Sequence, residues 1–492
     1  MELESVVGFL ENKSILITGA TGFLAKIFLE KVLRVQPKLK MVYLLLRAAD
    51  AKNASQRMQN EIIGKDLFRV LKEKWGTNLS SFISEKTVLV PGDISLGDEL
   101  GVEDPILREE MFVNLDVVIN LAATTNFDER YDVSLGLNTM GAKHVLCFAK
   151  KCVKSPVLIH VSTAYVAGEK SGLILESPYK MGESLNGVSG LNIDDERELV
   201  REKLNQLQAE GATADQIKEA MKDLGIKRAR AYGWPNTYVF TKAMGEMLVE
   251  RLKGNTSVAI VRPTIVTSTY KEPFPGWVEG IRTIDSVVVG YGKGRLTCFL
   301  FDVQGIIDAI PADMVVNAML VAMVAHAKQP PNHWIYQVGS SLRNPLRYSK
   351  LQDCGYRYFT KKPWIGKDGK PVIVGKMTVF GSMASFRRYM AIRYLFPLKG
   401  LEFANVAFCR TLDGMYTDLN RKIKFVMRLV ELYRPYLFFA GVFDDTNTEN
   451  LRVVARKQGI DVDEFGFDPT SFDWDDYFMN VHMPGIVKYI FK

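Results

Sequence analysis

Residues 14–35, SILITGATGFLAKIFLEKVLRV, place an apolar β-rich run, a glycine-containing turn and a helical pattern in direct succession. Within the turn, Gly19 permits a tight bend, Gly22 lets the backbone approach a diphosphate, and the small Ala25 lets helix and strand pack closely. The N-terminus of the following helix attracts anions. This order predicts a dinucleotide-binding turn, with a purely structural strand-to-helix connection as the alternative.

Five more short apolar runs follow along the chain, separated by helical patterns. Such runs are typical of strands buried on both faces of a parallel sheet. We therefore predict an α/β fold with a Rossmann-type doubly wound parallel sheet. Residues 176–230 form an insert before the last run, and its two charged amphipathic patterns predict solvated helices. The six predicted strands are residues 14–18, 41–46, 87–90, 116–120, 157–161 and 258–261.

The pattern changes after Ser340, where a turn-rich linker leads into helical apolar spacing. We predict a larger domain over residues 1–360 and a smaller, mainly helical C-terminal domain over residues 375–492. The boundary is expected within residues 345–375.

Composition narrows the class of protein. The 492 residues are 47% hydrophobic and 24% charged, which excludes a disordered chain, a collagen-like fibre and a small disulfide scaffold. No apolar run reaches the ~18 residues of a membrane-spanning helix, so we expect any membrane contact to be peripheral. The acidic start of the chain lacks an import signal. The five cysteines are scattered and predicted to be reduced: Cys147, Cys152, Cys298, Cys354 and Cys409.

Basic charge is concentrated late in the chain. Residues 361–440 carry 15 Lys and Arg against 5 Asp and Glu, whereas residues 441–492 carry 5 against 10. Residues 386–408 mix basic and aromatic side chains, and residues 421–439 repeat that mix at helical spacing. Two interpretations stay open, an apolar face buried in the core or contact with an anionic membrane surface. No nucleic-acid-binding motif accompanies the charge, so no nucleic acid is expected as a partner.

The residue at the end of the second apolar run indicates whether the chain binds NADH or NADPH. An acidic residue there would bind the free ribose hydroxyl of NADH, but the residue is Arg47, whose guanidinium suits the 2′-phosphate of NADPH. Arg57 could assist. Asp50 keeps NADH open as an alternative, and a merely solvated Arg47 is another.

Further candidate cofactor residues end the neighbouring runs. Asp93 could accept from the adenine amino group, and the alanines after Asn120 leave room for a flat cofactor. Each residue is equally a candidate turn former. The complete cofactor set is Thr18, Gly19, Thr21, Gly22, Phe23, Leu24, Arg47, Asp93, Ile94, Asn120, Ala122, Tyr238, Lys242 and Pro263.

Tyr238 and Lys242 are candidates for proton transfer. On a helix they lie one turn apart on the same face. We expect the lysine ammonium to lower the phenol pKa from ~10, so that Tyr238 becomes a usable acid, and to hold the cofactor ribose. Thr163, at the end of the fifth run, could hydrogen-bond the developing alkoxide, and the neighbouring Ser162 could substitute for it.

These motifs together resemble the extended short-chain dehydrogenase/reductase family. The stretches GATGFLA, AATTNFDERYD, HVSTAYVAGEK, GWPNTYVFTKAMGE, RPTIVTS and EPFPGWVEG closely resemble the alcohol-forming fatty acyl-CoA reductases, especially the plant branch. The resemblance assigns residues 1–360 to NADPH binding and residues 375–492 to the C-terminal reductase domain. It implies a structural or proton-relay role for Asn138, and a place beside the nicotinamide carboxamide for Arg262 and Pro263.

The resemblance implies NADPH-dependent reduction of a long-chain acyl-CoA to a primary alcohol. One hydride gives a hemithioacetal that collapses to aldehyde and CoA, and a second reduces the aldehyde. We expect saturated C16 to C22 chains, a product used in wax or suberin synthesis, and a location on the cytosolic face of the endoplasmic reticulum or in the cytoplasm. Because the plastid branch of the family is distinguished by a plastid extension, the resemblance leads us to expect neither a plastid location nor secretion.

Other functions share parts of the pattern. A dehydrogenase acting on a sterol or nucleotide sugar would use the same turn and Tyr-Lys pair, and an aldehyde-forming reductase would stop after one hydride. A dinucleotide-sensing scaffold would not need the catalytic residues. His144 and His160 lie in apolar settings typical of structural histidines, and no metal-binding pattern is present. The sequence leaves the oligomeric state open.

Overall fold

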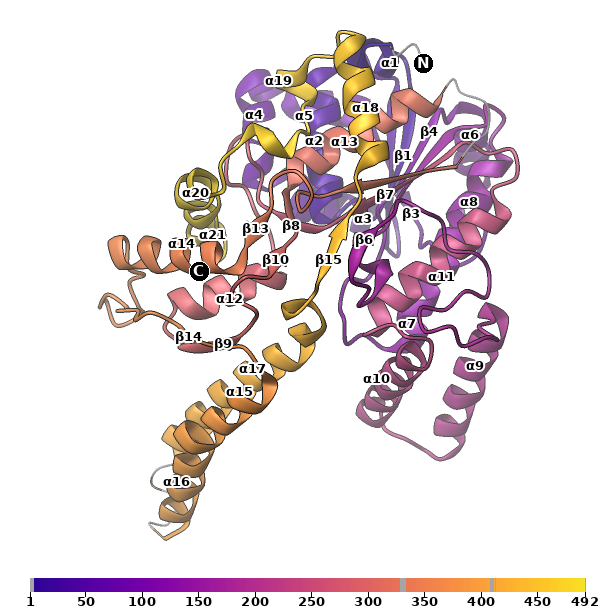
Figure 1. Cartoon of the computed structure of the whole chain (residues 1–492). Helices are drawn as coiled ribbons and strands as arrows, with labels where there is room; N and C mark the ends of the chain where they lie inside the picture. Colours follow the sequence, from indigo (N-terminus) through magenta and orange to yellow (C-terminus); the bar gives the residue numbers. More distant parts are fainter. Residues whose placement is uncertain (1–3, 328–332, 408–410, 412, 492) are drawn as a thin grey trace.

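A seven-stranded parallel sheet forms the centre of the computed structural model, which describes residues 4–327, 333–407, 411 and 413–491 (Figure 1). The strand order is β12-β7-β5-β4-β1-β2-β3, which confirms the doubly wound α/β fold. The sequence patterns missed only β12 among these strands. The strands are β1 Ser14–Thr18, β2 Met41–Leu46, β3 Thr87–Pro91, β4 Val117–Asn120, β5 Val157–Val161, β7 Val258–Pro263 and β12 His333–Val338.

Helices cover both faces of the sheet because its strands are apolar on both sides. Ile15 and Ile17 of β1 pack with α2, Phe23–Val35, and α13, Ala312–Ala327. Leu16, between them, belongs to the core of the opposite face. That face is covered by α6 Pro105–Asn114, α8 Gly141–Lys151 and α11 Thr237–Leu252.

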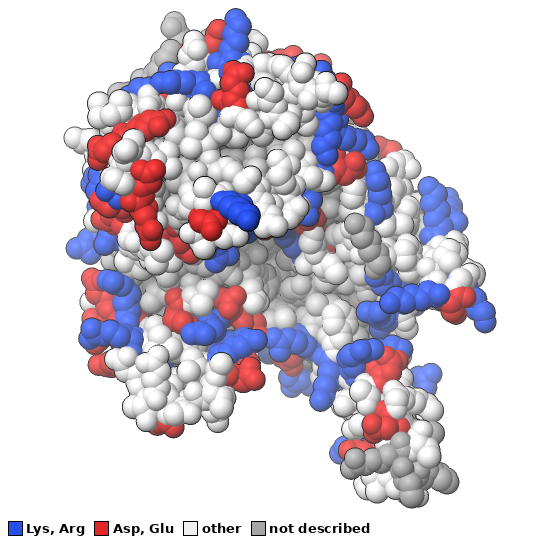
Figure 2. Space-filling view, turned by 180° about the vertical axis from the view of Figure 1, so that it is seen from behind, with Lys and Arg blue, Asp and Glu red and all other residues white. Residues whose placement is uncertain are grey.

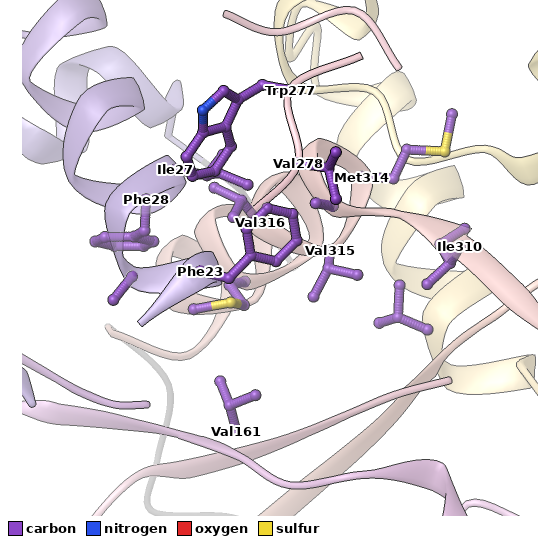
Figure 3. Close-up of a cluster of buried hydrophobic side chains, with 14 of the residues drawn as sticks. Phe23, Ile27, Phe28, Val161, Trp277, Val278, Ile310, Met314, Val315 and Val316 are labelled. Carbon is purple, nitrogen blue, oxygen red and sulfur yellow. The ribbon is translucent and has the colours of Figure 1, made fainter. Parts of the chain in front are cut away.

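Figure 3 shows part of the core beside the glycine turn. Phe23 on α2 points at Trp277, and their rings stack with centroids 5.1 Å apart. Val315 and Val316 of α13 lie near Phe23, whereas Val161 of β5 lies apart from the ring pair. The stacked aromatic pair helps to hold the start of α2 in place.

The predicted helical insert is confirmed as two long helices, α9 Ile193–Ala209 and α10 Ala214–Ala231. Asn192 caps the first helix, and Thr213 with Gln216 forms a capping box on the second. Other helices before residue 375 are α1 Val6–Leu10, α3 Ala51–Arg57, α4 Arg69–Trp75, α5 Leu79–Lys86, α7 Tyr131–Ser134, α12 Thr283–Gly292 and α14 Tyr348–Lys361.

The C-terminal part is mainly helical, as predicted. Two of its strands pair with strands from earlier in the chain. Strand β14, Thr378–Phe380, pairs with β9, Cys298–Leu300, and strand β15, Gly441–Phe443, pairs with β6, Gly172–Ile174. The helices are α15 Met383–Met390, α16 Phe396–Ala407, α17 Asp413–Leu437, α18 Thr446–Lys457, α19 Val462–Phe465, α20 Trp474–Asp476 and α21 Met483–Tyr489. The domain boundary stays a prediction.

Smaller elements complete the fold. β8, Ile265–Thr267, pairs with β11, Ala309–Pro311, and β10, Ile306–Ile307, pairs with β13, Leu346–Arg347. Four described cysteines are free thiols, whereas Cys409 lies outside the described residues. Within the described ranges, no helix combines the length and apolar character needed to cross a membrane, and no cluster of side chains could hold a metal ion.

Candidate active site

The turn after β1 has the backbone of a phosphate cradle. Gly19 has a φ of +64°, and a Cβ on it would lie 2.7 Å from the Ala122 Cα, so only glycine fits there. The Gly22 N–H donates to the Gly19 carbonyl at 2.8 Å, and Gly22 caps α2. Because the first N–H groups of a helix have no intrahelical partner, this end of α2 can bind an anion.

Beneath the cradle, polar side chains tie three strands together. The Thr18 hydroxyl donates to Asn120 Oδ1 at 2.7 Å, and Asn120 Nδ2 lies 3.0 Å from His160 Nδ1. Adjacent strands in register bring these residues together, since Thr18 pairs with Asn120 and Asn120 with His160. All three side chains are buried, so these contacts hold together the carboxyl ends of the three strands. Their contact with a cofactor stays a prediction.

The charged residues after β2 have different hydrogen-bond partners. Asp50 caps α3, because its carboxylate accepts from the Asn53 N–H at 2.7 Å. Arg57 pairs with Glu61 at 2.7 Å and donates to the backbone carbonyl of Arg47 at 2.7 Å. The guanidinium of Arg57 is thus committed to these partners, whereas the Arg47 side chain is exposed at the strand end.

The residues after β3 act as turn formers in the structure. Asp93 Oδ1 accepts from the Ser95 N–H at 2.8 Å and from the Ser95 hydroxyl at 2.9 Å. Ile94 is buried, and its carbonyl lies 2.7 Å from His144 Nδ1, which fits a structural histidine. Adenine binding by Asp93 or Ile94 stays a prediction.

The Tyr-Lys pair lies on α11, as expected. Asn236 caps this helix by accepting from the Val239 N–H at 3.1 Å. Lys242 is only 2% exposed, and its Nζ donates to the Val161 carbonyl at 2.7 Å. The ammonium is therefore anchored to the end of β5, one helical turn from Tyr238.

The expected lowering of the Tyr238 pKa is wrong for this structure. Burial raises the pKa of Tyr238 to about 12, while a hydrogen bond from Thr163 and the charge of Arg282 oppose that rise. Burial also lowers the pKa of Lys242 to about 8, against the effect of Glu246. For both groups the loss of contact with water has a larger effect on the pKa than the nearby charges have. Tyr238 is consequently fully protonated at neutral pH, as a proton donor must be.

Two hydroxyls at the end of β5 accompany Tyr238. Thr163 accepts from the Tyr165 N–H at 3.3 Å and hydrogen-bonds the Tyr238 phenol. The Ser162 hydroxyl is buried and has no hydrogen-bond partner in the described part of the chain. An unpartnered buried hydroxyl beside a proton donor can serve a substrate oxygen or a cofactor.

Asn138 supports the site from below. Its Oδ1 accepts from the Thr124 N–H at 3.0 Å, and its Nδ2 donates to the Thr124 carbonyl at 3.1 Å and to the Thr241 hydroxyl at 3.0 Å. These bonds join the loop after β4 to α11. They fit the structural role expected for Asn138.

A cavity of about 680 Å³ joins the two halves of the site. Its lining includes the start of α2 and the residues around Tyr238, and also the apolar side chains Phe299, Phe301, Ile307 and Met377. Predicted site residues in its lining are Gly22, Phe23, Leu24, Ser162, Thr163, Tyr238, Lys242 and Pro263. Those outside the lining are Thr18, Gly19, Thr21, Arg47, Asp93, Ile94, Asn120, Ala122 and Asn138.

Arg262 is not among the residues that line the cavity, and its expected place beside the carboxamide stays a prediction. Its Nε donates to Glu246 Oε1 at 3.1 Å, and both side chains are buried. Its Nη2 also donates to the Ser177 carbonyl at 3.1 Å. In this structure Arg262 of β7 is therefore paired with Glu246 of α11 and connects the two elements.

The sequence patterns missed an aromatic group around Tyr238. The Phe127 ring stacks on Tyr238 with centroids 5.8 Å apart, and it also contacts Tyr433 at 6.2 Å and Tyr436 at 5.5 Å. Phe127 belongs to the stretch AATTNFDERYD, residues 122–132, but Tyr433 and Tyr436 lie about 300 residues further along the chain, in α17. No local pattern marks them as neighbours of Tyr238.

Comparison with known proteins identifies the family. A family model described as "Male sterility protein" matches residues 17–319, and a second with the same description matches residues 393–492. The "Alcohol-forming fatty acyl-CoA reductase" of Simmondsia chinensis is 58% identical over 490 residues, covering 99% of each chain. "Fatty acyl-CoA reductase 1" of Arabidopsis thaliana is 53% identical, also covering 99% of each chain.

Solved structures share the fold. The terminal R domain from the myxalamid PKS-NRPS biosynthetic pathway has a TM-score of 0.56 at 17% identity, covering 97% of this chain and 91% of that one. A reductase domain of a non-ribosomal peptide synthetase from Mycobacterium tuberculosis has a TM-score of 0.58 at 16% identity, covering 97% and 92%. On the sequence matches, this chain belongs to the fatty acyl-CoA reductase family.

Proposed function

We propose that this enzyme reduces long-chain fatty acyl-CoA to a primary fatty alcohol with NADPH. The observation that carries the proposal is one cavity that is lined both by Tyr238, Ser162 and Thr163 and by apolar side chains suited to an acyl chain. The name of the Simmondsia chinensis relative supports the alcohol as product.

The residues present fit a nicotinamide cofactor. Gly19 has a φ of +64° and no room for a Cβ beside Ala122, which is the tight turn that the first glycine of a dinucleotide-binding turn supplies. We propose NADPH over NADH because Asp50 is engaged as a helix cap, while Arg47 is exposed beside it. The bound cofactor would supply a hydride to the acyl carbonyl.

The chain's own residues would handle the oxygen of the reacting carbonyl. Tyr238, protonated at neutral pH, would donate its proton to the developing alkoxide. The unpartnered Ser162 hydroxyl would donate a hydrogen bond to the same oxygen, and the Thr163 hydroxyl would do so after turning away from Tyr238, as in an oxyanion hole. Lys242, fixed by the Val161 carbonyl, would place positive charge beside this group.

Substrate range and cellular role follow as finer proposals. The apolar end of the cavity supports saturated chains of C16 to C22. We propose that the alcohols enter wax or suberin lipids, and that the enzyme works on the cytosolic face of the endoplasmic reticulum or in the cytoplasm.

Product analysis tests the proposal. Purified protein in mild detergent is given stearoyl-CoA with NADPH or NADH, and alcohol, aldehyde and oxidised cofactor are quantified. We expect alcohol with two NADPH consumed per chain, and a loss of roughly a hundredfold or more in Tyr238→Phe. Tyr43→Phe is the matched control, because Tyr43 lies on β2 and the change likewise removes a phenol oxygen, one that donates to Glu110 of α6.

The outcomes separate the alternatives. Accumulation of aldehyde would show that the enzyme stops after one hydride. Cofactor binding without turnover of any acyl-CoA would contradict the proposal and favour a sterol or nucleotide-sugar substrate.

A further inference from the structure

Two antiparallel helical segments project from the body of the molecule as an arm (Figure 1). The arm consists of α15, the π-helical turn Ala391–Leu395, α16 and α17. Near the body it is anchored by core side chains such as Phe386 and Val430, each buried to 0% exposure. Farther from the body, α16 packs on α17 and on the π-helical turn.

One side of the outer arm exposes large apolar side chains. Ile392, Phe396, Phe403 and Val406 are 62%, 65%, 77% and 69% exposed. Steps of four, seven and three residues keep them on one face of a helix, so they form a continuous apolar stripe. Met415 and Leu419 on α17 add exposures of 53% and 39% at a spacing of four. The core interpretation of residues 386–408 is therefore wrong for the four stripe residues, although it is right for Phe386 and Met390, which are buried.

Basic side chains accompany the stripe. Residues 383–437 carry ten Lys and Arg against four Asp and Glu. Arg388, Arg393 and Lys399 are exposed, and Lys399 lies between Phe396 and Phe403 in sequence. In Figure 2, Lys and Arg gather where the arm meets the body, and the outer arm shows Asp and Glu among mostly uncharged residues.

The inner end of the arm reaches the candidate active site. Leu432, Tyr433, Tyr436 and Leu437 of α17 line the same cavity as Tyr238. The helix that begins in the exposed part of the arm thus ends at the cavity wall. A surface bound by the arm would lie at a fixed distance from the site, since α17 is continuous over 25 residues.

We propose that the stripe Ile392, Phe396, Phe403 and Val406 docks into the surface of a lipid bilayer that contains anionic lipids. An apolar helix face with basic neighbours buries its side chains among the acyl chains and places its cations near lipid phosphates. A protein partner would need a surface with negative charge at the right positions, whereas a bilayer with anionic lipids presents negative charge at every point of contact. The arm then holds the cavity next to the membrane.

Vesicle co-sedimentation of the full chain tests the docking without any measurement of activity. The probes are phosphatidylcholine vesicles with and without phosphatidylserine. We expect partition to the anionic vesicles, lost in Phe396→Gln with Phe403→Gln. Neutralising Arg388, Arg393 and Lys399 to Gln should weaken partition roughly a hundredfold, at about fivefold per charge.

Matched controls lie elsewhere on the surface. Ile106 and Val153 are 80% and 74% exposed, and their replacement by Gln should leave partition unchanged. Gln at Arg197, Arg201 and Lys218 of the insert removes three exposed charges away from the arm. Thermal unfolding should be equal in all variants, since the changed side chains are exposed.

Three outcomes would overturn the proposal. The wild-type chain could stay in the supernatant with both kinds of vesicle. The double Phe variant could bind as tightly as the wild type. Analytical ultracentrifugation could instead show a wild-type dimer that the same variant converts to a monomer, which would assign the stripe to a second copy of this chain.

Discussion

The side-chain amide of Asn236 donates a hydrogen bond to the hydroxyl of Tyr436 at 2.7 Å. The other end of the same amide caps α11 through the Val239 N–H. One residue therefore fixes the start of the helix that carries Tyr238 and Lys242, and connects that helix to α17. The arrangement links the arm to the geometry of the candidate active site.

Removing the Tyr436 hydroxyl should loosen this connection. Tyr436→Phe is expected to cost about 1 kcal/mol in the free energy of unfolding, because one partly buried hydrogen bond is lost. We also expect kcat to fall severalfold while cofactor affinity is unchanged. Urea unfolding and steady-state kinetics measure both effects. Tyr433→Phe on the same helix is the control, since its contact to Ser286 is longer, at 3.3 Å; equal kinetics in both variants would contradict the link.

The ammonium of Lys242 should set the basic limb of the pH profile. Its pKa in the folded chain is lowered to about 8, so the charged form is present below that pH and is lost as pH rises through it. Because kcat/KM reports groups of the free enzyme, we expect it to fall about tenfold per pH unit above this value.

Lys242→Arg provides the check on that assignment. Guanidinium stays charged throughout the range, so the residual activity of this variant should lose the basic limb. A limb that persists in Lys242→Arg would assign the titration to another group.

Cofactor preference should depend on Arg47 and not on Asp50. Arg47→Glu is expected to lower kcat/KM with NADPH at least tenfold and to improve the ratio in favour of NADH, because a carboxylate repels a 2′-phosphate and binds ribose hydroxyls. Asp50→Ala should cost about 1 kcal/mol of stability through loss of the α3 cap, without changing the preference. A switch of cofactor in Asp50→Ala would contradict this division.

The buried pair Glu246 and Arg262 should be costly to break from one side. Glu246→Gln is expected to lower the free energy of unfolding by roughly 3 to 5 kcal/mol, since an arginine at 2% exposure loses its counter-ion. Replacing both partners, Glu246→Leu with Arg262→Met, should recover much of that loss. Denaturant unfolding of the three chains measures the difference, and equal stability of the single and double variants would show that the charge was not the cause.

Much of the framework could be predicted from local patterns. The apolar runs matched the strands within about two residues, because a strand buried on both faces must be continuously apolar. The fourth strand begins at Val117 instead of residue 116, where Asp116 accepts from the Ser14 N–H at 2.9 Å. The spacing of Tyr238 and Lys242 placed both on α11 for the same local reason.

The sequence by itself determined the strand-turn-helix order, the glycine at a positive φ and the pairing of Tyr238 with Lys242, because these depend on neighbours a few positions away. Only the tertiary structure decided that Asp50 caps a helix, that Arg262 pairs with Glu246, and that α17 closes the cavity. The pKa of Tyr238 belongs to the second group, since it depends on desolvation by segments distant in the chain. Local patterns encode backbone conformation, whereas burial and charge pairing exist only once those segments meet.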